Sequence, residues 1–417
     1  MKKIIVAHPE KQHSHRLAKA IHGYGMLEEY VTTVYYKNKN LTKVVDGLTR
    51  RRFSLSISRR IEDIPTNKVK QYYELRGLFL LVMRHTRYHK FINWLQNNNF
   101  DKFGKKVAER AIKKKVDAVV MYDTNSLECF KKIKGEKKNI KCIMDTSIAN
   151  RFYTKAIYEK VIECEKDWEK FSESRVLLNK QEMARLLEEI NLTDYFLVPS
   201  KFVKNSLIYS GVSEEKICIV PYGVDIDLFE YSERRENITS GKLNILFVGQ
   251  CSYRKGINYL LKAISEMQDD VALTIVGGYD NITELYEKYS KCENIKFCGR
   301  VQHSQLPQIY KKADVFALPS LSEGMSLVGL EAMACGVPLL CSMNCGVNDV
   351  VMQGENGWIL ERIDSESIKE TLKDIILNRT KLPEMGRNAR LTAENYSWKV
   401  YEKNMQQALE KILGEVK

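Results

Sequence analysis

The sequence predicts an α/β protein built from two doubly wound domains, and three observations support this. The chain has 417 residues, roughly two to three times the usual length of one domain. Short apolar runs alternate with segments of helical periodicity along nearly the whole length, which is typical of open parallel sheets covered by helices. A polar, strongly charged stretch at 231–242 interrupts this pattern near the middle. We therefore expect two parallel sheets joined by a linker.

The expected elements follow the chain in order. In the first half, strands are expected at 3–7, 31–36, 118–122, 141–145, 195–199 and 216–220, with helical stretches near 72–96, 101–115 and 153–190. In the second half, strands at 244–248, 272–276, 294–297, 315–318 and 338–341 are separated by shorter helices. We predict a first domain over 1–225, a linker over 226–242, a second domain over 243–395 and a final segment over 396–417.

Composition excludes several classes of protein. Apolar residues make up 44% of the chain and charged residues 29%, so it is not disordered, collagen-like or coiled-coil. The ten cysteines show no paired CxxC motif and no zinc spacing, which favours a reducing, cytoplasmic compartment. The apolar run at 4–7 is too short for the core of a signal peptide, and no window approaches the length of a membrane span.

The first motif that carries chemistry follows the strand at 244–248. It reads VGQCSYRKG, with Gly249 at the end of the strand and Arg254 and Lys255 directly before the next expected helix. In an open α/β sheet, ligands bind at the carboxyl ends of the strands, where helix N-termini attract anions. An isolated turn of this kind is more often only a solvated basic turn.

The second motif is PSLSEGMSLVGLEAMACGVP at 319–338. A strand ends before it, a Glu-Gly turn contains Glu323, and a helix starts near Ser326 with Glu331 about one and a half turns in. Side chains tilt toward a helix N-terminus, so both carboxylates are expected at one rim. Two carboxylates beside phosphates would repel them unless they bind hydroxyls. The combination predicts a nucleotide sugar as ligand, whereas either glutamate alone would be read as a helix-capping or exposed acid.

The Glu323 and Glu331 pair, the VGQCSYRKG turn and the segment at 198–225 together resemble retaining glycosyltransferases of the GT-B fold, family 4. The resemblance is specific from about residue 195 to residue 357 and architectural before that. It implies two Rossmann-like domains that face a cleft. It also implies that the segment at 396–417 forms a helix that crosses back onto the first domain, which then binds the acceptor.

The resemblance also implies roles for individual residues. Glu323 would contact hydroxyls of the donor sugar, Glu331 the ribose, and Lys255 the diphosphate. The amides of Gly324, Met325, Ser326 and Leu327 would meet the phosphates, Gly249 would border them, and Arg300 and Val301 would lie at the base. The arginine common after the strand-end glycine is Gln250 here, and we hypothesise that Arg254 supplies the missing charge. The expected catalytic set is Glu323, Lys255 and Arg254.

The first domain is less informative. Its opening turn, HPEKQHSH, lacks the glycine pair that many relatives have, and His13 and His15 are the candidates for contact with the acceptor. A plain surface loop is the alternative. After the strand at 141–145 the chain reads Asp145-Thr146-Ser147, where many relatives place a histidine near the sugar. No protein base is assigned in this domain.

The resemblance implies a hexosyltransferase-type enzyme. It would transfer a sugar, with retention, from a UDP- or GDP-sugar to a hydroxyl of a glycan or lipid-linked glycan, in bacterial surface polysaccharide synthesis. No metal and no cofactor besides the donor are expected. The alternatives are a nucleotide-sugar epimerase or a phosphorylase on the same fold, and a non-catalytic sugar-binding protein. A glycosidase that uses the two glutamates is less favoured because it needs no phosphate clamp.

Positive charge is concentrated at the start of the chain. Residues 1–120 carry 26 lysines and arginines against 10 acidic residues, while the remainder is nearly balanced. Basic clusters flank apolar runs within residues 50–95, a pattern that suits an anionic membrane surface at the inner face of the cell membrane. The alternatives are a core helix with a solvated basic face and a surface that binds an anionic glycan acceptor. Nucleic acid is not expected as a partner, because no recognition motif accompanies the charge.

Overall fold

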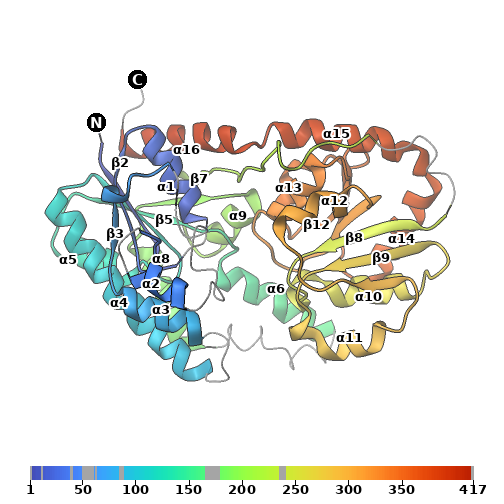
Figure 1. Ribbon diagram of the computed structural model, residues 1–417, viewed down its shortest axis with the longest axis horizontal. Coiled ribbons are helices and arrows are strands. Elements are labelled where there is room, and N and C mark those ends of the chain that lie inside the picture. Colours follow the sequence, from blue (N-terminus) through green and yellow to red (C-terminus); the bar gives the residue numbers. More distant parts are fainter. Residues whose placement is uncertain are drawn as a thin grey trace.

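The computed structural model describes residues 2–10, 13–37, 41–48, 61, 63–83, 89–164, 179–233 and 241–414. Two fully parallel sheets lie side by side in two lobes (Figure 1), which confirms the predicted two-sheet α/β fold. The strand orders are β3-β2-β1-β4-β5-β6-β7 and β10-β9-β8-β11-β12-β13. Each sheet starts in its interior and grows outward in both directions. The β1–β4 and β8–β11 neighbours are therefore the switch points where such sheets bind ligands.

The first sheet has short strands and longer helices. Its strands are β1 (Ile4–Ala7), β2 (Leu27–Thr32), β3 (Val69–Gln71), β4 (Ala118–Tyr122), β5 (Lys141–Asp145), β6 (Tyr195–Val198) and β7 (Ile217–Ile219). The helices that accompany it are α1 (Ser14–Gly23), α2 (Leu41–Leu48), α3 (Glu74–Met83), α4 (His89–Lys114), α5 (Leu127–Gly135), α6 (Arg151–Cys164), α8 (Lys180–Asn191) and α9 (Lys201–Tyr209).

Alternation along these strands explains why both faces are covered. In β4, Val119 and Met121 join a core with α4 and α5, whereas Val120 and Tyr122 join the core on the other face. Successive side chains of a strand point to opposite faces, so an all-apolar strand needs helices on both sides.

The second sheet is more regular. Its strands are β8 (Leu243–Val248), β9 (Val271–Val276), β10 (Ile295–Phe297), β11 (Val315–Leu318), β12 (Leu339–Ser342) and β13 (Gly357–Leu360). Its helices are α10 (Ile257–Ser265), α11 (Thr283–Tyr289), α12 (Leu306–Tyr310), α13 (Leu327–Ala334), α14 (Ser365–Leu377) and α15 (Leu382–Glu394).

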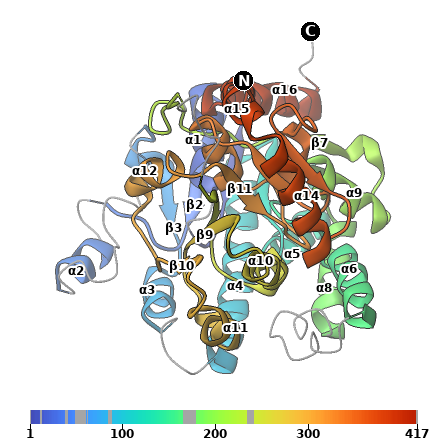
Figure 2. The same ribbon diagram turned by 90° about the vertical axis from the view of Figure 1, so that its right-hand side faces the viewer.

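The last helix, α16 (Trp398–Leu413), returns to the first lobe and packs on α1. Figures 1 and 2 show both helices together at the top of the molecule. The Arg16 guanidinium lies 4.5 Å from the centre of the Trp398 ring, and the Tyr401 ring is 6.3 Å from that of Tyr222. Residues from the end of the chain therefore form part of the core beside the first sheet.

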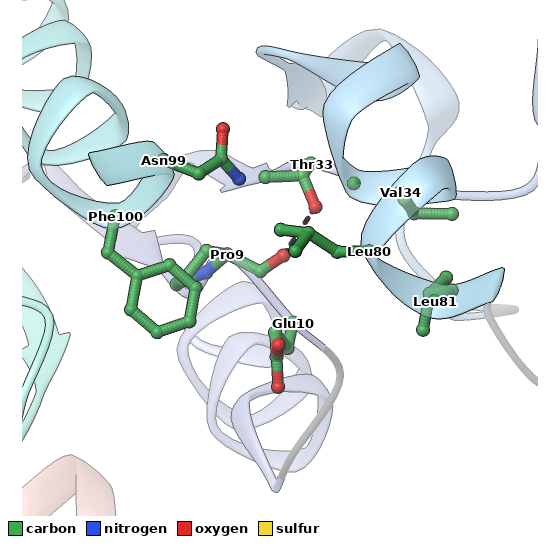
Figure 3. A pocket seen from close by; sticks show the side chains of 9 residues that line it. Pro9, Glu10, Thr33, Val34, Leu80, Leu81, Asn99 and Phe100 are labelled. Carbon is green, nitrogen blue, oxygen red and sulfur yellow. Dashed lines mark hydrogen bonds between the residues drawn. The ribbon is translucent and has the colours of Figure 1, made fainter. Parts of the chain in front are cut away.

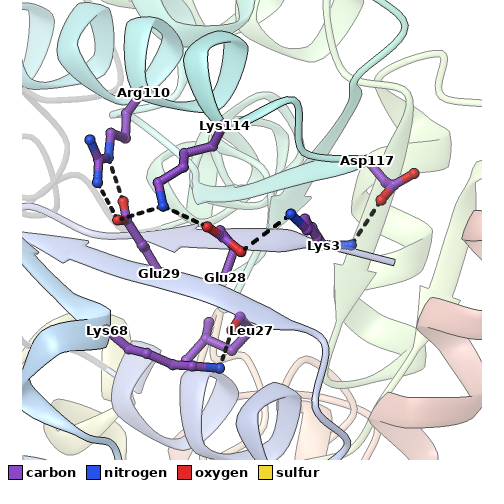
Figure 4. A network of polar contacts seen from close by, with 8 residues as sticks. All are labelled: Lys3, Leu27, Glu28, Glu29, Lys68, Arg110, Lys114 and Asp117. Atoms are coloured by element: carbon purple, nitrogen blue, oxygen red, sulfur yellow. Dashed lines mark hydrogen bonds and ion pairs between the residues drawn. The ribbon is translucent and has the colours of Figure 1, made fainter. Parts of the chain in front are cut away.

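An ionic network lies at the amino ends of the first strands (Figure 4). Arg110 of α4 donates to the buried Glu29 of β2 at 2.7 Å, and Lys114 donates to Glu28 at 2.7 Å. The Lys3 amide donates to the Asp117 carboxylate at 2.8 Å. This network neutralises part of the positive charge of the first domain at the edge of the sheet opposite to its carboxyl ends.

Three features of the local structure differ from expectation. The strand expected at 31–36 begins earlier, at Leu27, and the edge strands β3 and β13 were not predicted. The boundary predicted between the helices near 72–96 and 101–115 is wrong, because α4 runs without a break through the asparagines at 97–99. Within the described residues, no helix is both long enough and apolar enough to cross a membrane.

Candidate active site

The turn after β8 brings both predicted motifs together. Gly256 begins α10 with a φ of 67°, a left-handed conformation that favours glycine. A Cβ at this position would also collide with the carbonyl oxygen of Pro319, at the end of β11. The close approach holds the short 3-10 turn η5 (Tyr253–Lys255) against the segment that leads to Glu323.

Arg254, Lys255 and Glu323 form one cluster at this place. The Arg254 guanidinium donates to Glu323 Oε2 at 2.6 Å and to the Ser322 carbonyl at 2.7 Å. The Lys255 ammonium lies 3.5 Å from the same carboxylate oxygen, and a Cβ on Gly249 would be 3.1 Å from Lys255 Nζ. Burial opposes ionisation of Glu323, but the two cations outweigh it and lower the pKa of this carboxyl below its usual value.

The start of α13 lies beside this cluster. Ser326 is the N-cap residue with an extended backbone, and its side chain makes no capping hydrogen bond. The first amides of a helix have no partner within the helix, so those that follow Ser326 are available to an anion. Leu327 is the first residue of α13 and is partly exposed. The predicted phosphate-binding stretch therefore lies at a helix N-terminus.

Two contacts join this stretch to the first domain. A Cβ on Gly324 would collide with the carbonyl oxygen of Ser147, so only glycine permits this approach of the backbone. The Tyr222 amide donates to the Met325 sulfur at 3.2 Å. The loop at 319–326 of the second domain is thus in contact with the loop that follows β5.

Glu331 belongs to a separate cluster. His303 Nε2 lies 2.9 Å from one oxygen of Glu331, and the Tyr310 hydroxyl donates to the other oxygen at 3.1 Å. The His303 ring also packs edge-on against Phe229. The hydrogen bond to Glu331 raises the pKa of His303 above its usual value, although burial opposes this.

Of the two residues predicted at the base, Arg300 is exposed and Val301 is half-buried. Arg300 donates to Asp280 at 2.9 Å and lies 3.4 Å from the Gln250 side-chain oxygen. Gln250, after β8, therefore holds an arginine that follows β10, two strands away in the sheet, while Arg254 and Lys255 hold Glu323. Val301 packs against the core of the second domain.

The two candidate histidines, His13 and His15, do not share a site. His13 Nε2 lies 3.1 Å from the Asp145 carboxylate, at the end of β5, and 3.2 Å from the Tyr222 hydroxyl. His15 packs against the rings of Tyr30 and Tyr35 instead. The structure thus links His13, through Tyr222, to Met325 in the loop at 319–326, and sets His15 apart from it.

Asp123, which follows β4 directly, was not singled out in the sequence. Burial and the nearby Glu189 raise the pKa of Asp123 to about 7. Glu189 itself accepts hydrogen bonds from the amides of Thr124, Ser126 and Leu127 and so shapes the loop after β4. The position of Asp123 at the end of a central strand was the feature of the sequence that could have marked it as a site residue, as it could for Asp145. Nothing in the sequence around His303 or Tyr222 distinguishes them.

A metal site has no obvious ligands. Among the residues that the structure describes, no three or more histidine, cysteine, aspartate or glutamate side chains are grouped to hold an ion.

Comparison with known proteins assigns the second domain to a family. Residues 229–392 match the model of glycosyl transferases group 1. An uncharacterized 41.2 kDa protein in the cps region of Klebsiella pneumoniae is 31% identical over 186 residues, which cover 43% of this chain and 51% of that protein. A D-inositol 3-phosphate glycosyltransferase of Corynebacterium jeikeium is 29% identical over 203 residues, covering 44% of this chain and 48% of the relative. The chain thus spans about half the length of the curated relatives it matches.

The fold is similar to a solved structure over the whole chain. The Anabaena protein Alr3699/HepE, crystallised with UDP, superposes with a TM-score of 0.64 at 16% identity and covers 99% of this chain and 100% of that one. The match of the second domain and the two-sheet fold agree with the resemblance seen in the motifs. The second domain is thus similar to glycosyl transferases group 1, and the chain as a whole has the GT-B fold.

Proposed function

We propose that the chain transfers a sugar from a nucleotide-sugar donor to a hydroxyl group of a glycan or lipid-linked acceptor, with retention of configuration. The observation that carries this proposal is the cluster of Arg254, Lys255 and Glu323 at the start of α13. Two cations and a helix N-terminus suit a diphosphate, and a buried carboxylate among them suits sugar hydroxyls. The Anabaena structure with UDP and the glycosyltransferase names of the relatives support the same assignment.

The second domain supplies the donor site in this proposal. Lys255 and Arg254 bind the diphosphate together with the amides that follow Ser326. Glu323 then turns from the cations to the donor-sugar hydroxyls, while Glu331, held by His303 and Tyr310, binds the ribose.

The chemical step is front-face transfer. As the bond from the anomeric carbon to the phosphate oxygen breaks, negative charge develops on the leaving diphosphate. Lys255, Arg254 and the amides of α13 are positioned beforehand and stabilise this charge without reorganisation. The leaving phosphate accepts the proton of the acceptor hydroxyl as the new bond forms on the same face. No protein nucleophile is required, and we propose that the fixed cations serve in place of a metal ion.

The test is a panel of UDP- and GDP-sugars with methyl glycosides as acceptors, followed by anomeric NMR of the product. We expect one donor to be consumed with retention, and saturating EDTA to leave the rate within about twofold. Epimerised donor would identify an epimerase instead, and phosphate-dependent cleavage would identify a phosphorylase. Binding without turnover would identify a sugar-binding protein. An inverted product would refute the front-face step.

We also propose that the first domain docks on an anionic membrane. The observation is a row of exposed apolar side chains on α3: Leu75 is 68% exposed and Phe79 46%, and Val82 continues the same face one turn later. Leu41 and Val44 of α2 are exposed as well. Positive charge in residues 1–120 complements anionic lipid. Of the predicted surface at 50–95, the basic clusters at 50–52, 59–60 and 84–87 lie outside the described residues.

Vesicle co-sedimentation tests this docking. Binding should increase with the fraction of anionic lipid, decrease in high salt, and fall in the triple variant Leu75→Ser, Phe79→Ser, Val82→Ser. A matched control replaces three exposed apolar residues of the second domain, Met352, Leu377 and Leu391, by serine. Equal loss in both triple variants, or binding that ignores salt, would refute the docking surface.

A further inference from the structure

The first domain contains a cavity that none of the assignments above uses. It measures about 270 Å³ and lies between α4, α6 and α8, beside the loop after β4. The residues that line it are Gln96, Asn97, Phe100, Asp101, Thr124, Leu127, Arg151, Glu182, Arg185, Leu186 and Glu189. Its volume is many times the 10–15 Å³ or so that one water molecule needs. A single sugar ring fits within it.

The position of this cavity follows from the topology. Thr124 and Arg151 come just after the carboxyl ends of β4 and β5. The lining residues of α4 lie in its first half, and α4 runs back toward the start of β4. All walls therefore belong to the carboxyl edge of the first sheet, the edge where open α/β sheets bind ligands.

The charges in the cavity are already paired with one another. Arg185 donates to Asp101 at 2.6 Å, and Arg151 donates to Glu182 at 3.1 Å. Glu189 accepts from the loop amides. Since each arginine has its own carboxylate, the wall presents many hydrogen-bonding groups without a free cationic site for a phosphate or carboxylate. This lining suits an uncharged polyol whose ring packs on Phe100 and the two leucines.

A second, smaller cavity adjoins the first. It measures about 20 Å³ and shares Arg151, Leu186 and Glu189 with the larger one. Thr146 also lines it, and the buried Thr146 hydroxyl has no hydrogen-bond partner among the described residues. A buried, unpaired hydroxyl carries a free-energy cost that a bound ligand would remove.

The loop that carries Thr146 reaches the donor site. Ser147 lies directly against Gly324, and the Thr154 hydroxyl of α6 lies 3.1 Å from that of Ser322. The loop that borders the small cavity at Thr146 thus continues at Ser147 into the contact with Gly324, which follows Glu323 in the chain.

A third cavity does not compete for this role. It lies between α3 and α4, where the Thr33 hydroxyl donates to the Pro9 carbonyl (Figure 3). Its volume is about 10 Å³, room for roughly one water molecule.

We infer that the cavity between α4, α6 and α8 is a subsite for an uncharged sugar ring of the acceptor. The inference rests on the proposed glycosyl transfer. It adds the chemical class of the acceptor residue and the side chains that hold it, with the Thr146 hydroxyl as one contact.

Binding rather than turnover provides the test. Saturation-transfer NMR on the full chain with UDP or GDP present would use methyl glycosides of glucose, galactose, mannose and N-acetylglucosamine as neutral probes. Methyl glucuronide and glucose 6-phosphate are the anionic probes. At least one neutral glycoside should bind, and neither anionic probe should bind more tightly. Tighter binding of an anionic probe, or no binding of any neutral glycoside, would overturn the inference.

Two variants locate the bound sugar. Asn97→Trp fills the cavity from α4 and should weaken glycoside binding about tenfold or more, while Gln181→Trp, on an exposed face of α8 outside the cavity, should leave it unchanged. Thr146→Val should weaken binding about three- to tenfold yet leave the unfolding midpoint equal or higher, since it removes an unpaired buried hydroxyl. Unchanged binding in both cavity variants would place the sugar elsewhere. Because no turnover is needed, glycoside binding can succeed where transfer fails, and the two proposals are tested separately.

Discussion

The Arg254 guanidinium donates to the Glu323 carboxylate across 2.6 Å, at the head of the helix where the donor diphosphate is proposed to bind. The carboxylate thus holds the cations in place of a phosphate. Binding of the donor must break this pair, and the freed carboxylate then faces the sugar. This exchange gives the first prediction.

Glu323→Gln should abolish transfer and strengthen binding of the free nucleoside diphosphate by about 3- to 10-fold, equivalent to roughly 0.7–1.4 kcal/mol. Its charge no longer competes with the phosphates for Arg254 and Lys255. Calorimetric titration with UDP or GDP measures this affinity. Glu331→Gln serves as the contrast, because it should weaken binding of the nucleotide instead. Weaker nucleotide binding by the Glu323 variant would contradict the exchange.

Lys255→Met should reduce nucleotide affinity about 10- to 150-fold, since a hydrogen bond to a charged group contributes about 1.5–3 kcal/mol. Lys262→Met, on an exposed face of α10, is the matched control and should bind normally. Arg254→Met should reduce nucleotide affinity by a similar factor if Arg254 replaces the arginine absent at Gln250. A neutral Arg254 variant would leave Lys255 as the main cation of the site.

His303 should make stability depend on pH in a defined direction. Its hydrogen bond to Glu331 raises the pKa of the folded state above that of the unfolded chain. The stabilisation is therefore complete below about pH 6.5 and is lost as the pH rises through the folded pKa. His303→Gln, which keeps a donor but does not titrate, should be less stable than the wild type at pH 5.5 and equal to it at pH 9. Exposed pairs contribute at most about 1 kcal/mol, so thermal scans must resolve a few degrees. A constant difference across pH would contradict this pairing.

Asp123 should also make the protein less stable as the pH rises, but over a lower pH range. Its pKa is raised to about 7 in the folded protein, so the folded state retains a proton that the unfolded chain has lost. Wild-type stability should then fall as the pH rises from about 4 to 7. Asp123→Asn imitates the neutral acid. In thermal unfolding, the variant should therefore be much more stable than the wild type at pH 8 and only slightly more stable at pH 4.5. An equal advantage at both pH values would show that charge is not the cause.

Tyr401 tests the packing of α16 on the first domain. Its ring is buried and lies 5.4 Å from that of Trp398. Tyr401→Ala should cost about 3–5 kcal/mol in urea unfolding and expose the first domain to limited proteolysis. Its buried hydroxyl has no partner among the described residues, so Tyr401→Phe should be as stable as the wild type or more so. Cleavage confined to the second domain of Tyr401→Ala would count against this packing.

The sequence predicted most strands of the sheets because they are buried and nearly all apolar. It misplaced β2, whose first half contains two adjacent glutamates that interrupt the apolar pattern. Glu29 is paired inside the sheet with Arg110, which is 81 positions away in the chain, and with Lys114. The asparagines at 97–99 likewise have weak helix propensity, and packing of α4 against the sheet and α5 overrides it. Such long-range compensation leaves no local signal.

The residues of the candidate site likewise fall into those that a local pattern predicts and those that only the folded chain brings together. Arg254, Lys255 and Glu323 were found because a strand, a turn and a helix start encode their position locally. His303 and Tyr222 were missed because only the folded chain places them beside Glu331 and Met325. The sugar-sized cavity combines walls from four separate segments, so spacing in the sequence gives no sign of it.

The return of α16 to the first lobe also has a consequence for synthesis of the chain. As the ribosome releases the polypeptide, the first sheet emerges early, but the surface that α16 covers stays open until residues 398–413 are translated. The first domain is therefore completed only after the second domain has been made. A nascent chain that stalls before residue 398 exposes this apolar surface, which is the kind of surface that chaperones bind and that drives aggregation.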